Sequence, residues 1–67
     1  MASIQILASS YGTRGEVVAV EYGVVVWTGP IEAVAEGERF DALFCHDDDV
    51  NLLKGLAHAA GFDVSAS

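Results

Sequence analysis

The residues of this chain best suited to chemistry gather in one short stretch, where a cysteine and a histidine precede three aspartates. Cys45 and His46 are soft metal ligands, and the carboxylates of Asp47–Asp49 are the oxygen ligands that Mg²⁺ and Ca²⁺ prefer. His58 is the one further soft ligand in the sequence. A structural zinc site needs four ligands at CxxC-like spacing, which this chain does not have. We therefore expect no structural metal and no cofactor, and at most a weak divalent-cation site at Asp47–Asp49.

Nucleophilic catalysis is also a poor fit to these residues. Cys45 and His46 are adjacent, so in a strand their side chains point to opposite faces and cannot act as a nucleophile and its base. A chain of 67 residues leaves no room for a nucleophile, a base and an oxyanion site together. We expect a protein that is not an enzyme, with Cys45 as a small buried hydrophobe and His58 as an exposed helix residue.

Negative charge is the strongest compositional signal. Ten acidic residues stand against three basic ones, giving a formal net charge of −7. Such a chain repels nucleic acid and acidic membranes and attracts basic protein surfaces. Part of the charge is expected to converge on one partner-binding surface, formed by seven carboxylates that lie close together in the sequence: Glu32, Glu36, Glu38, Asp41, Asp47, Asp48 and Asp49.

Length and composition indicate one folded domain spanning residues 1–67. Hydrophobic residues make up 52% of the chain and only one residue is proline, which argues against intrinsic disorder. A single cysteine cannot form an internal disulfide and fits a reducing compartment. The N-terminus lacks the pattern of a signal peptide, and the apolar run Val24–Trp27 is far too short to span a membrane. We expect a soluble, cytoplasmic domain.

The first half of the chain is typical of β-structure. Residues 3–9 alternate as a half-buried strand, 10–15 form a glycine-containing loop, and 16–22 and 24–28 are rich in β-branched residues. Tyr22-Gly23 lacks the Asn-Gly or Asp-Gly chemistry of a two-residue hairpin turn. Two strands, or one long strand bent by a bulge at Gly23, are both compatible with this pattern.

The second half predicts one clear helix and two ambiguous segments. Residues 31–36 follow Gly29-Pro30 as a short helix or a strand, and 38–45 fit a strand better than a helix. Residues 50–60 have a helical apolar stripe, with Asp49 as N-cap and Gly61 just past the end. Gly55 in mid-helix suggests close packing against a neighbour. Phe62 and Val64 then return to the core.

These elements predict an α+β fold. We expect a small antiparallel sheet of about three to four strands, with the C-terminal helix, and a short second helix, packed on one face. Such a sheet has edges, and the run Val24–Trp27 favours aggregation if it is exposed on one of them. Helices or a second chain are expected to cover it.

Two segments resemble parts of known families. Residues 6–17 resemble the first strand and Gly-Thr-Arg-Gly-Asp-Val loop of some nucleotide-sugar glycosyltransferases, with Glu16 in place of the aspartate. This chain cannot contain the two large domains of those enzymes, so a plain hairpin loop is favoured. Residues 40–64 are similar to the first βαβ unit of response-regulator receivers, in which an acidic cluster after a strand binds magnesium. The phospho-accepting aspartate has no counterpart, which favours helix capping and solvated charge at Asp47–Asp49.

The leading functional hypothesis is a non-enzymatic binding protein that occupies a basic, nucleic-acid-binding surface of a partner protein. Small size, strong acidity and the lack of motifs resemble, as a profile, the phage-encoded inhibitors of bacterial defence, such as anti-CRISPR proteins and other DNA mimics. That resemblance implies a partner such as a Cas effector and a location in the host cytoplasm. Apolar anchors such as Tyr11, Trp27 or Phe44 would have to accompany the charges.

Two other functions remain open from the sequence. One is a small oligomerising or assembly protein, in which valine-rich strands pair across a subunit interface and the acidity keeps it soluble. The other is a divalent-metal-binding module at Asp47–Asp49. Neither reading involves direct contact with nucleic acid or a membrane, and the chain is expected to be a monomer or a small homo-oligomer.

Overall fold

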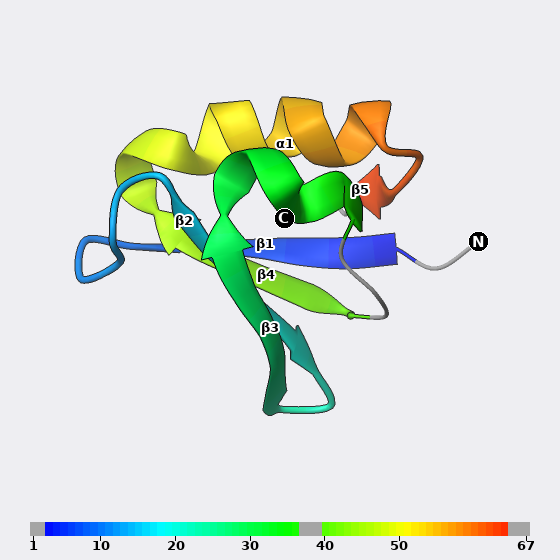
Figure 1. Ribbon diagram of the computed structural model, residues 1–67, viewed down its shortest axis with the longest axis horizontal. Helices are drawn as coiled ribbons and strands as arrows, with labels where there is room; N and C mark the ends of the chain where they lie inside the picture. Colours follow the sequence, from blue (N-terminus) through cyan, green and yellow to red (C-terminus); the bar gives the residue numbers. More distant parts are fainter. Residues whose placement is uncertain (1–2, 37–39, 65–67) are drawn as a thin grey trace.

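The fold is a five-stranded sheet with its helices on one face (Figure 1). The computed structural model describes residues 3–36 and 40–64. The strands are β1 (Ser3–Ser9), β2 (Glu16–Glu21), β3 (Val24–Pro30), β4 (Ala42–His46) and β5 (Asp63–Val64). The helices are the 3₁₀ helices η1 (Ile31–Glu36) and η2 (Asp47–Asp49) and the α-helix α1 (Val50–Ala59). No helix in the described ranges is long and apolar enough to cross a membrane.

The strand order is β3-β2-β4-β1-β5, and the α+β class is confirmed. The sheet has one strand more than expected and is mixed, because β2 is antiparallel to β3 and β4 whereas β1 is parallel to β4 and β5. The connection between β4 and β5, which contains α1, makes these two strands run in the same direction. Helix α1 carries the chain back across the sheet, so β5 runs in the direction of β4, with β1 inserted between them.

Tyr22 and Gly23 form a two-residue turn between β2 and β3. The chain therefore forms two strands here, and the alternative of one long strand bent at Gly23 is wrong. Tyr22 has φ of 51° and Gly23 has φ of 80°, the pair of positive angles that a type I′ turn requires. The Tyr22 N–H donates to Oδ2 of Asp41 at 3.2 Å, a contact between distant segments that favours the turn despite its tyrosine. The irregularity in this strand pair lies between Ala19 and Val20 instead of at Gly23.

The core lies between the sheet and the two helices α1 and η1. Alternate residues of the central strands face the helices. The strand register aligns these residues in rows across the sheet. Trp27 on β3, half-buried, packs against this core. The buried apolar side chains are Ile4, Val17, Ala19, Ile31, Val34, Phe40, Leu43, Cys45, Leu53 and Ala57.

Helix α1 buries the stripe expected from its sequence. Leu53 and Ala57 are fully buried and Leu56 is half-buried, while Lys54 and His58 are exposed. Ala60 is the C-cap and is exposed, in contrast to the predicted stripe, because the helix ends at Ala59.

The end of α1 is a Schellman motif, as the glycine predicts. Gly61 has φ of 93°, and its N–H donates to the carbonyl oxygen of His58. The Phe62 N–H donates to the carbonyl oxygen of Ala57 at 3.0 Å, which completes the motif. The Phe62 ring then lies 4.9 Å from the ring of Phe40 at 40°, so the helix end turns the chain back onto the core.

The close packing expected at Gly55 is absent. A Cβ atom added there would meet no atom within 4 Å in the described part of the chain. Gly12 is the opposite case, because a Cβ at that position would lie 3.0 Å from the backbone nitrogen of His46. Gly12, unlike Gly55, therefore needs to be glycine for lack of space.

Replacing Gly55 with alanine should stabilise the protein by about 0.5–1 kcal/mol, because alanine restricts the unfolded chain and favours the helix. The matched variant Gly12→Ala should destabilise it, because backbone atoms would have to move. Urea denaturation followed by circular dichroism measures both. A Gly55→Ala variant less stable than the parent would mean that another chain packs against α1.

Candidate functional site

The chemistry-bearing residues meet at the end of the sheet where β1 and β4 finish. These two strands are parallel and Ser9 is in register with His46, so their carboxyl ends lie side by side. The loop of residues 10–15 follows β1, and the aspartates of η2 follow β4. Because loops after adjacent parallel strands emerge at the same edge, residues far apart in the sequence come together here.

Gly15 joins three elements at this end of the sheet. Its N–H donates to Oδ2 of Asp49 at 2.7 Å, and its carbonyl oxygen accepts a hydrogen bond from the Ile31 N–H at 2.9 Å. Gly15 has φ of 80°, a left-handed conformation that costs glycine little. One residue thus links the loop to the start of α1 and to the start of η1.

Asp49 occupies the predicted N-cap position of α1, but its side chain makes no capping hydrogen bond. The carboxylate instead accepts the hydrogen bond from Gly15. The reason is η2, which precedes α1 and moves the beginning of the helical segment back along the chain. At that earlier position, Nδ1 of His46 accepts the Asp48 N–H at 3.0 Å and acts as the cap.

Arg14 in the loop forms an ion pair with the second aspartate. Its Nη2 lies 3.2 Å from Oδ2 of Asp48, with the two side chains 70% and 57% exposed. At that exposure the pair contributes less than about 1 kcal/mol to stability. The ion pair has a larger effect on the surface charge, because the one basic side chain of the loop is held beside the carboxylate of Asp48.

Two of the three aspartates, Asp48 and Asp49, have different partners. Asp48 contacts Arg14, and Asp49 binds the Gly15 amide. Within residues 3–36 and 40–64, no three His, Cys, Asp or Glu side chains are grouped so as to hold a metal ion. The metal-binding alternative therefore has no preformed set of ligands in this part of the chain.

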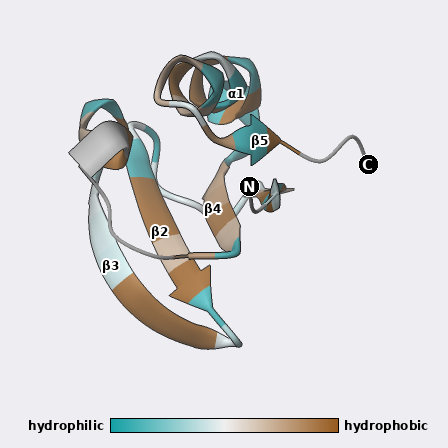
Figure 2. Ribbon diagram, turned by 90° about the vertical axis from the view of Figure 1, so that its right-hand side faces the viewer, coloured by the Kyte–Doolittle hydropathy of each residue, from teal (hydrophilic) through white to brown (hydrophobic). Residues whose placement is uncertain are grey.

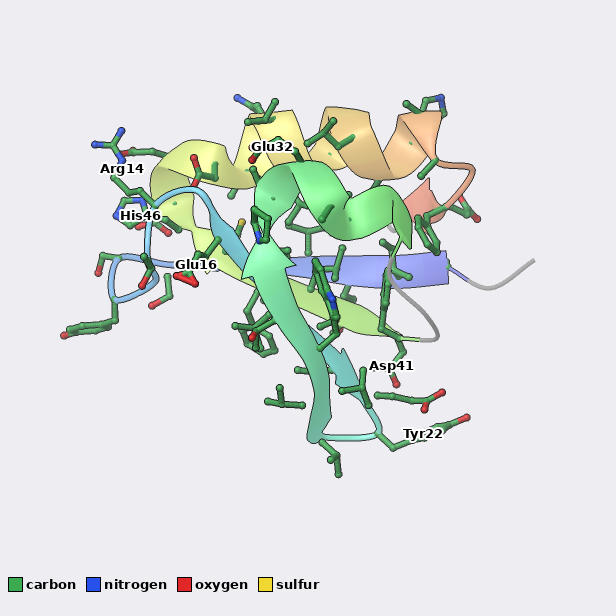
Figure 3. The ribbon with its side chains drawn as sticks, viewed as in Figure 1. Arg14, Glu16, Tyr22, Glu32, Asp41 and His46 are labelled. Carbon is green, nitrogen blue, oxygen red and sulfur yellow. The ribbon has the colours of Figure 1, made fainter. Side chains whose placement is uncertain are left out.

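The structure divides the seven predicted partner-binding acids. Asp47–Asp49 lie at the carboxyl end of β4, and Glu32 lies in the first turn of η1, next to the Ile31 amide that binds Gly15. Asp41 precedes β4 and lies near Tyr22, at the other end of the sheet (Figure 3). The Glu36 side chain and all of Glu38 lie outside the described residues.

Glu16 belongs to the same acidic end and was missed from the sequence. It begins β2 directly after Gly15 and is in register with Pro30, so it lies beside the start of η1. Its carboxylate is exposed. We call Glu16, Glu32 and Asp47–Asp49 the acidic end. The pairing of β2 with β4 places Val17 opposite Cys45 and so brings Glu16 to the end where the aspartates lie. The pairing of β2 with β3 brings it beside η1, and neither register could be read from spacing along the chain.

The face of the sheet opposite α1 and η1 is bare and largely apolar. One row across four strands follows from the register: Thr28, Val18, Phe44 and Leu7. Phe44 is 40% exposed, and no described element covers this face. We call this row the open-face row. Figure 2 shows the sheet with its helices on one side only.

A pocket of about 400 Å³ lies where the open-face row meets the loop after β1. Its floor includes Val18 and Phe44, and Tyr11 and Gly12 belong to its wall. The full lining is Ser9, Tyr11, Gly12, Thr13, Glu16, Val18, Thr28, Phe44 and Cys45. The close approach of Gly12 to the His46 backbone holds the loop against the end of β4.

The hairpin between β2 and β3 is a second exposed apolar feature. Tyr22 is 87% exposed and Val25 is 57% exposed, and Val24 and Val26 are also exposed. The hairpin projects away from α1, and its distal part is strongly hydrophobic (Figures 1 and 2). Among the proposed anchors, Tyr11 and Phe44 are available on the surface, whereas Trp27 is half-buried against the core.

Cys45 is buried, as the sequence predicts, and its thiol is not activated as a nucleophile. Burial raises the pKa of its thiol, and the negative charges of Asp49 and Asp47 raise the pKa further. A thiol with a raised pKa is a poor nucleophile near neutral pH.

No family model, curated protein or solved structure matches this chain.

Replacing Asp49 with alanine should lower the free energy of unfolding by about 0.5–2 kcal/mol, because the Gly15 amide loses a charged acceptor. Asp47→Ala should cost less than about 0.5 kcal/mol. Urea denaturation gives the stabilities, and hydrogen exchange of the Gly15 amide should accelerate only in the Asp49 variant. Unchanged exchange at Gly15 would contradict this junction.

The raised pKa of Cys45 predicts a loss of stability at alkaline pH. Above about pH 8.5 the thiol ionises in the unfolded chain before it ionises in the folded one, so the unfolded state is favoured as the pH rises. Melting curves between pH 7 and pH 10, compared with a Cys45→Ala variant, should show a steeper decline in the parent. Equal slopes would show that the thiol ionises alike in both states.

Proposed function

We propose that this chain is a non-enzymatic binding protein that docks its acidic end and open-face row on a basic, nucleic-acid-binding surface of a partner protein. One observation carries the proposal. An uncovered apolar sheet face borders directly on a group of carboxylates, and the basic side chain of the adjoining loop is held by Asp48.

The two parts of this surface serve different purposes. Exposed carboxylates steer a basic partner toward the surface and raise the association rate, but each exposed ion pair adds little affinity. Leu7, Phe44 and Tyr11 provide exposed apolar area beside those charges. Aromatic and aliphatic anchors of this kind supply most of the binding energy in protein interfaces.

The charge of the chain supports a partner that normally binds nucleic acid. Surfaces that bind phosphate backbones are strongly basic, and an array of carboxylates presents them with a similar negative field. With a formal net charge of −7, the chain itself has no general attraction for nucleic acid. Inhibitors of bacterial defence, which the sequence resembles in profile, would act in this way by occupying a Cas effector or a related complex.

Self-assembly is the second candidate, and the hairpin favours it. β3 is an edge strand whose residues Val24–Pro30 carry no charge, and its first three valines are exposed. Uncharged, exposed edges pair readily with another strand. The net charge opposes association of two identical copies, which is why we rank this function second.

Affinity capture from a bacterial lysate that contains defence systems, repeated at low and high salt, should recover a nucleic-acid-handling complex only at low salt. Exposed charges are screened as the Debye length falls from about 10 Å at 0.1 M to about 3 Å at 1 M. Binding of the purified partner should weaken in the Asp47→Asn, Asp48→Asn double variant and more so when both residues become lysine. Nucleic acid should compete with the chain.

A matched double variant controls for net charge. Asp41→Asn with Asp63→Asn removes the same charge at exposed positions away from the acidic end, and should change binding little. Equal effects of the two double variants would mean that net charge alone is recognised. If binding ignores salt and all these variants, while Val25→Lys abolishes a dimer in analytical ultracentrifugation, self-assembly takes the place of the proposal.

A further inference from the structure

We infer that the pocket between the loop after β1 and the open-face row is a binding site for a guanidinium group, the side-chain head of an arginine. The inference deepens the proposed function, because the arginine would belong to the basic partner. The site itself is tested on this chain alone. The strand register brings a charge, hydroxyl groups and aromatic rings to the pocket.

The pocket is lined by residues of β1, β2, β3 and β4 and of the loop after β1, which meet through long-range pairing. Val18 on β2 is in register with Phe44 on β4 and with Thr28 on β3, and these side chains face away from the helices. Glu16 stands at the start of β2, two residues before Val18 and therefore on the same face. The loop adds Tyr11 and Gly12 beside them. An apolar floor thus has one carboxylate at its border.

The charges at the pocket select a cation. Glu16 is the one acidic residue of the lining, and the lining contains no lysine, arginine or histidine. The nearest basic residue in the sequence, Arg14, is outside the lining and is bound to Asp48. The aspartates that follow β4 add to the negative potential at this end of the sheet. An anionic ligand would be repelled from this site.

The other lining groups favour guanidinium over a simple ammonium ion. Ser9, Thr13 and Thr28 add hydroxyl groups to the lining, which can accept hydrogen bonds. The Ser9 hydroxyl oxygen already accepts one hydrogen bond from the Tyr11 N–H at 3.0 Å. Guanidinium is planar, carries five N–H donors and stacks on aromatic faces such as Phe44 or Tyr11. An ammonium ion is compact and more strongly hydrated, so it gains less from an apolar floor. A neutral sugar could use the hydroxyls and the ring but not the charge.

The test is an NMR titration of the whole chain, labelled with ¹⁵N, with N-acetyl-arginine amide, a probe whose ends carry no charge. We expect saturable shifts at the amides of Gly12, Thr13, Val18 and Phe44, with an affinity in the millimolar range. N-acetyl-lysine amide should bind several-fold more weakly, and glucose should cause no saturable shift. Shifts confined to Asp47–Asp49, or equal binding of glucose, would overturn the inference.

Two variants locate the charge that the probe recognises. Glu16→Gln should weaken binding of the arginine probe roughly three- to tenfold, as expected for loss of one charged hydrogen bond at an exposed site. Asp63→Asn removes an exposed acid on β5, outside the pocket lining and away from the acidic end, and should leave the affinity unchanged. Circular dichroism melts should show that both variants are folded. Equal affinities in the two variants would overturn the site.

The outcome also separates this inference from the function on which it rests. If the arginine probe does not bind while the partner still binds in a salt-dependent way, the pocket is wrong and the proposed function stands. If the probe binds and Glu16→Gln weakens it, the site stands even where affinity capture recovers no basic partner.

Discussion

The hydrogen bond between the Asp49 carboxylate and the Gly15 amide holds the acidic end of this molecule together. It is a short contact, 2.7 Å, between residues that belong to different halves of the chain. Through the Gly15 carbonyl the same residue also fixes the first residue of η1. The loop and the acidic end depend on this junction for their relative positions, although the hydrogen bond itself is exposed to solvent.

A second constraint is size. With α1 and η1 on one side, 67 residues supply a single core layer, and the residues that are described offer nothing to cover the other side of the sheet. Small domains bury a small share of their surface, so an apolar sheet face left open is a consequence of length as much as of selection. In this protein the open-face row lies next to carboxylates, so the exposed surface combines an apolar patch with negative charge.

Elements governed by local signals were predictable from the sequence. The spacing of Leu53 and Ala57 and the glycine at position 61 gave the position and end of α1, and alternation identified the first strand and the burial of Ile4. Features that depend on distant partners were not predictable. The N-cap of the helical segment is His46 instead of Asp49, because η2 precedes α1. Strand β5 has only two residues, which is too few to show an alternating pattern.

The candidate site depends almost entirely on such distant partners. Aspartates 47–49 were recognised by composition, but Glu16 joins them only through the pairing of β2 with β4. Asp41, close to them in the sequence, is separated from them by the length of β4. Sequence proximity was therefore a poor guide to which charges share a surface, because strands carry neighbouring residues to opposite ends of a sheet.

The position of β1 in the sheet has a consequence for how the chain folds. β1 precedes the other four strands of the sheet along the chain, yet both of its neighbours, β4 and β5, come from the second half of the sequence. On the ribosome it has no pairing partner until residues 42–46 emerge, while β2 and β3 can form their hairpin at once. Folding must therefore close long loops before the sheet is complete, which slows it. Until then the backbone of β1 is unpaired. During this time a chaperone could bind it, or it could pair with a strand of another chain.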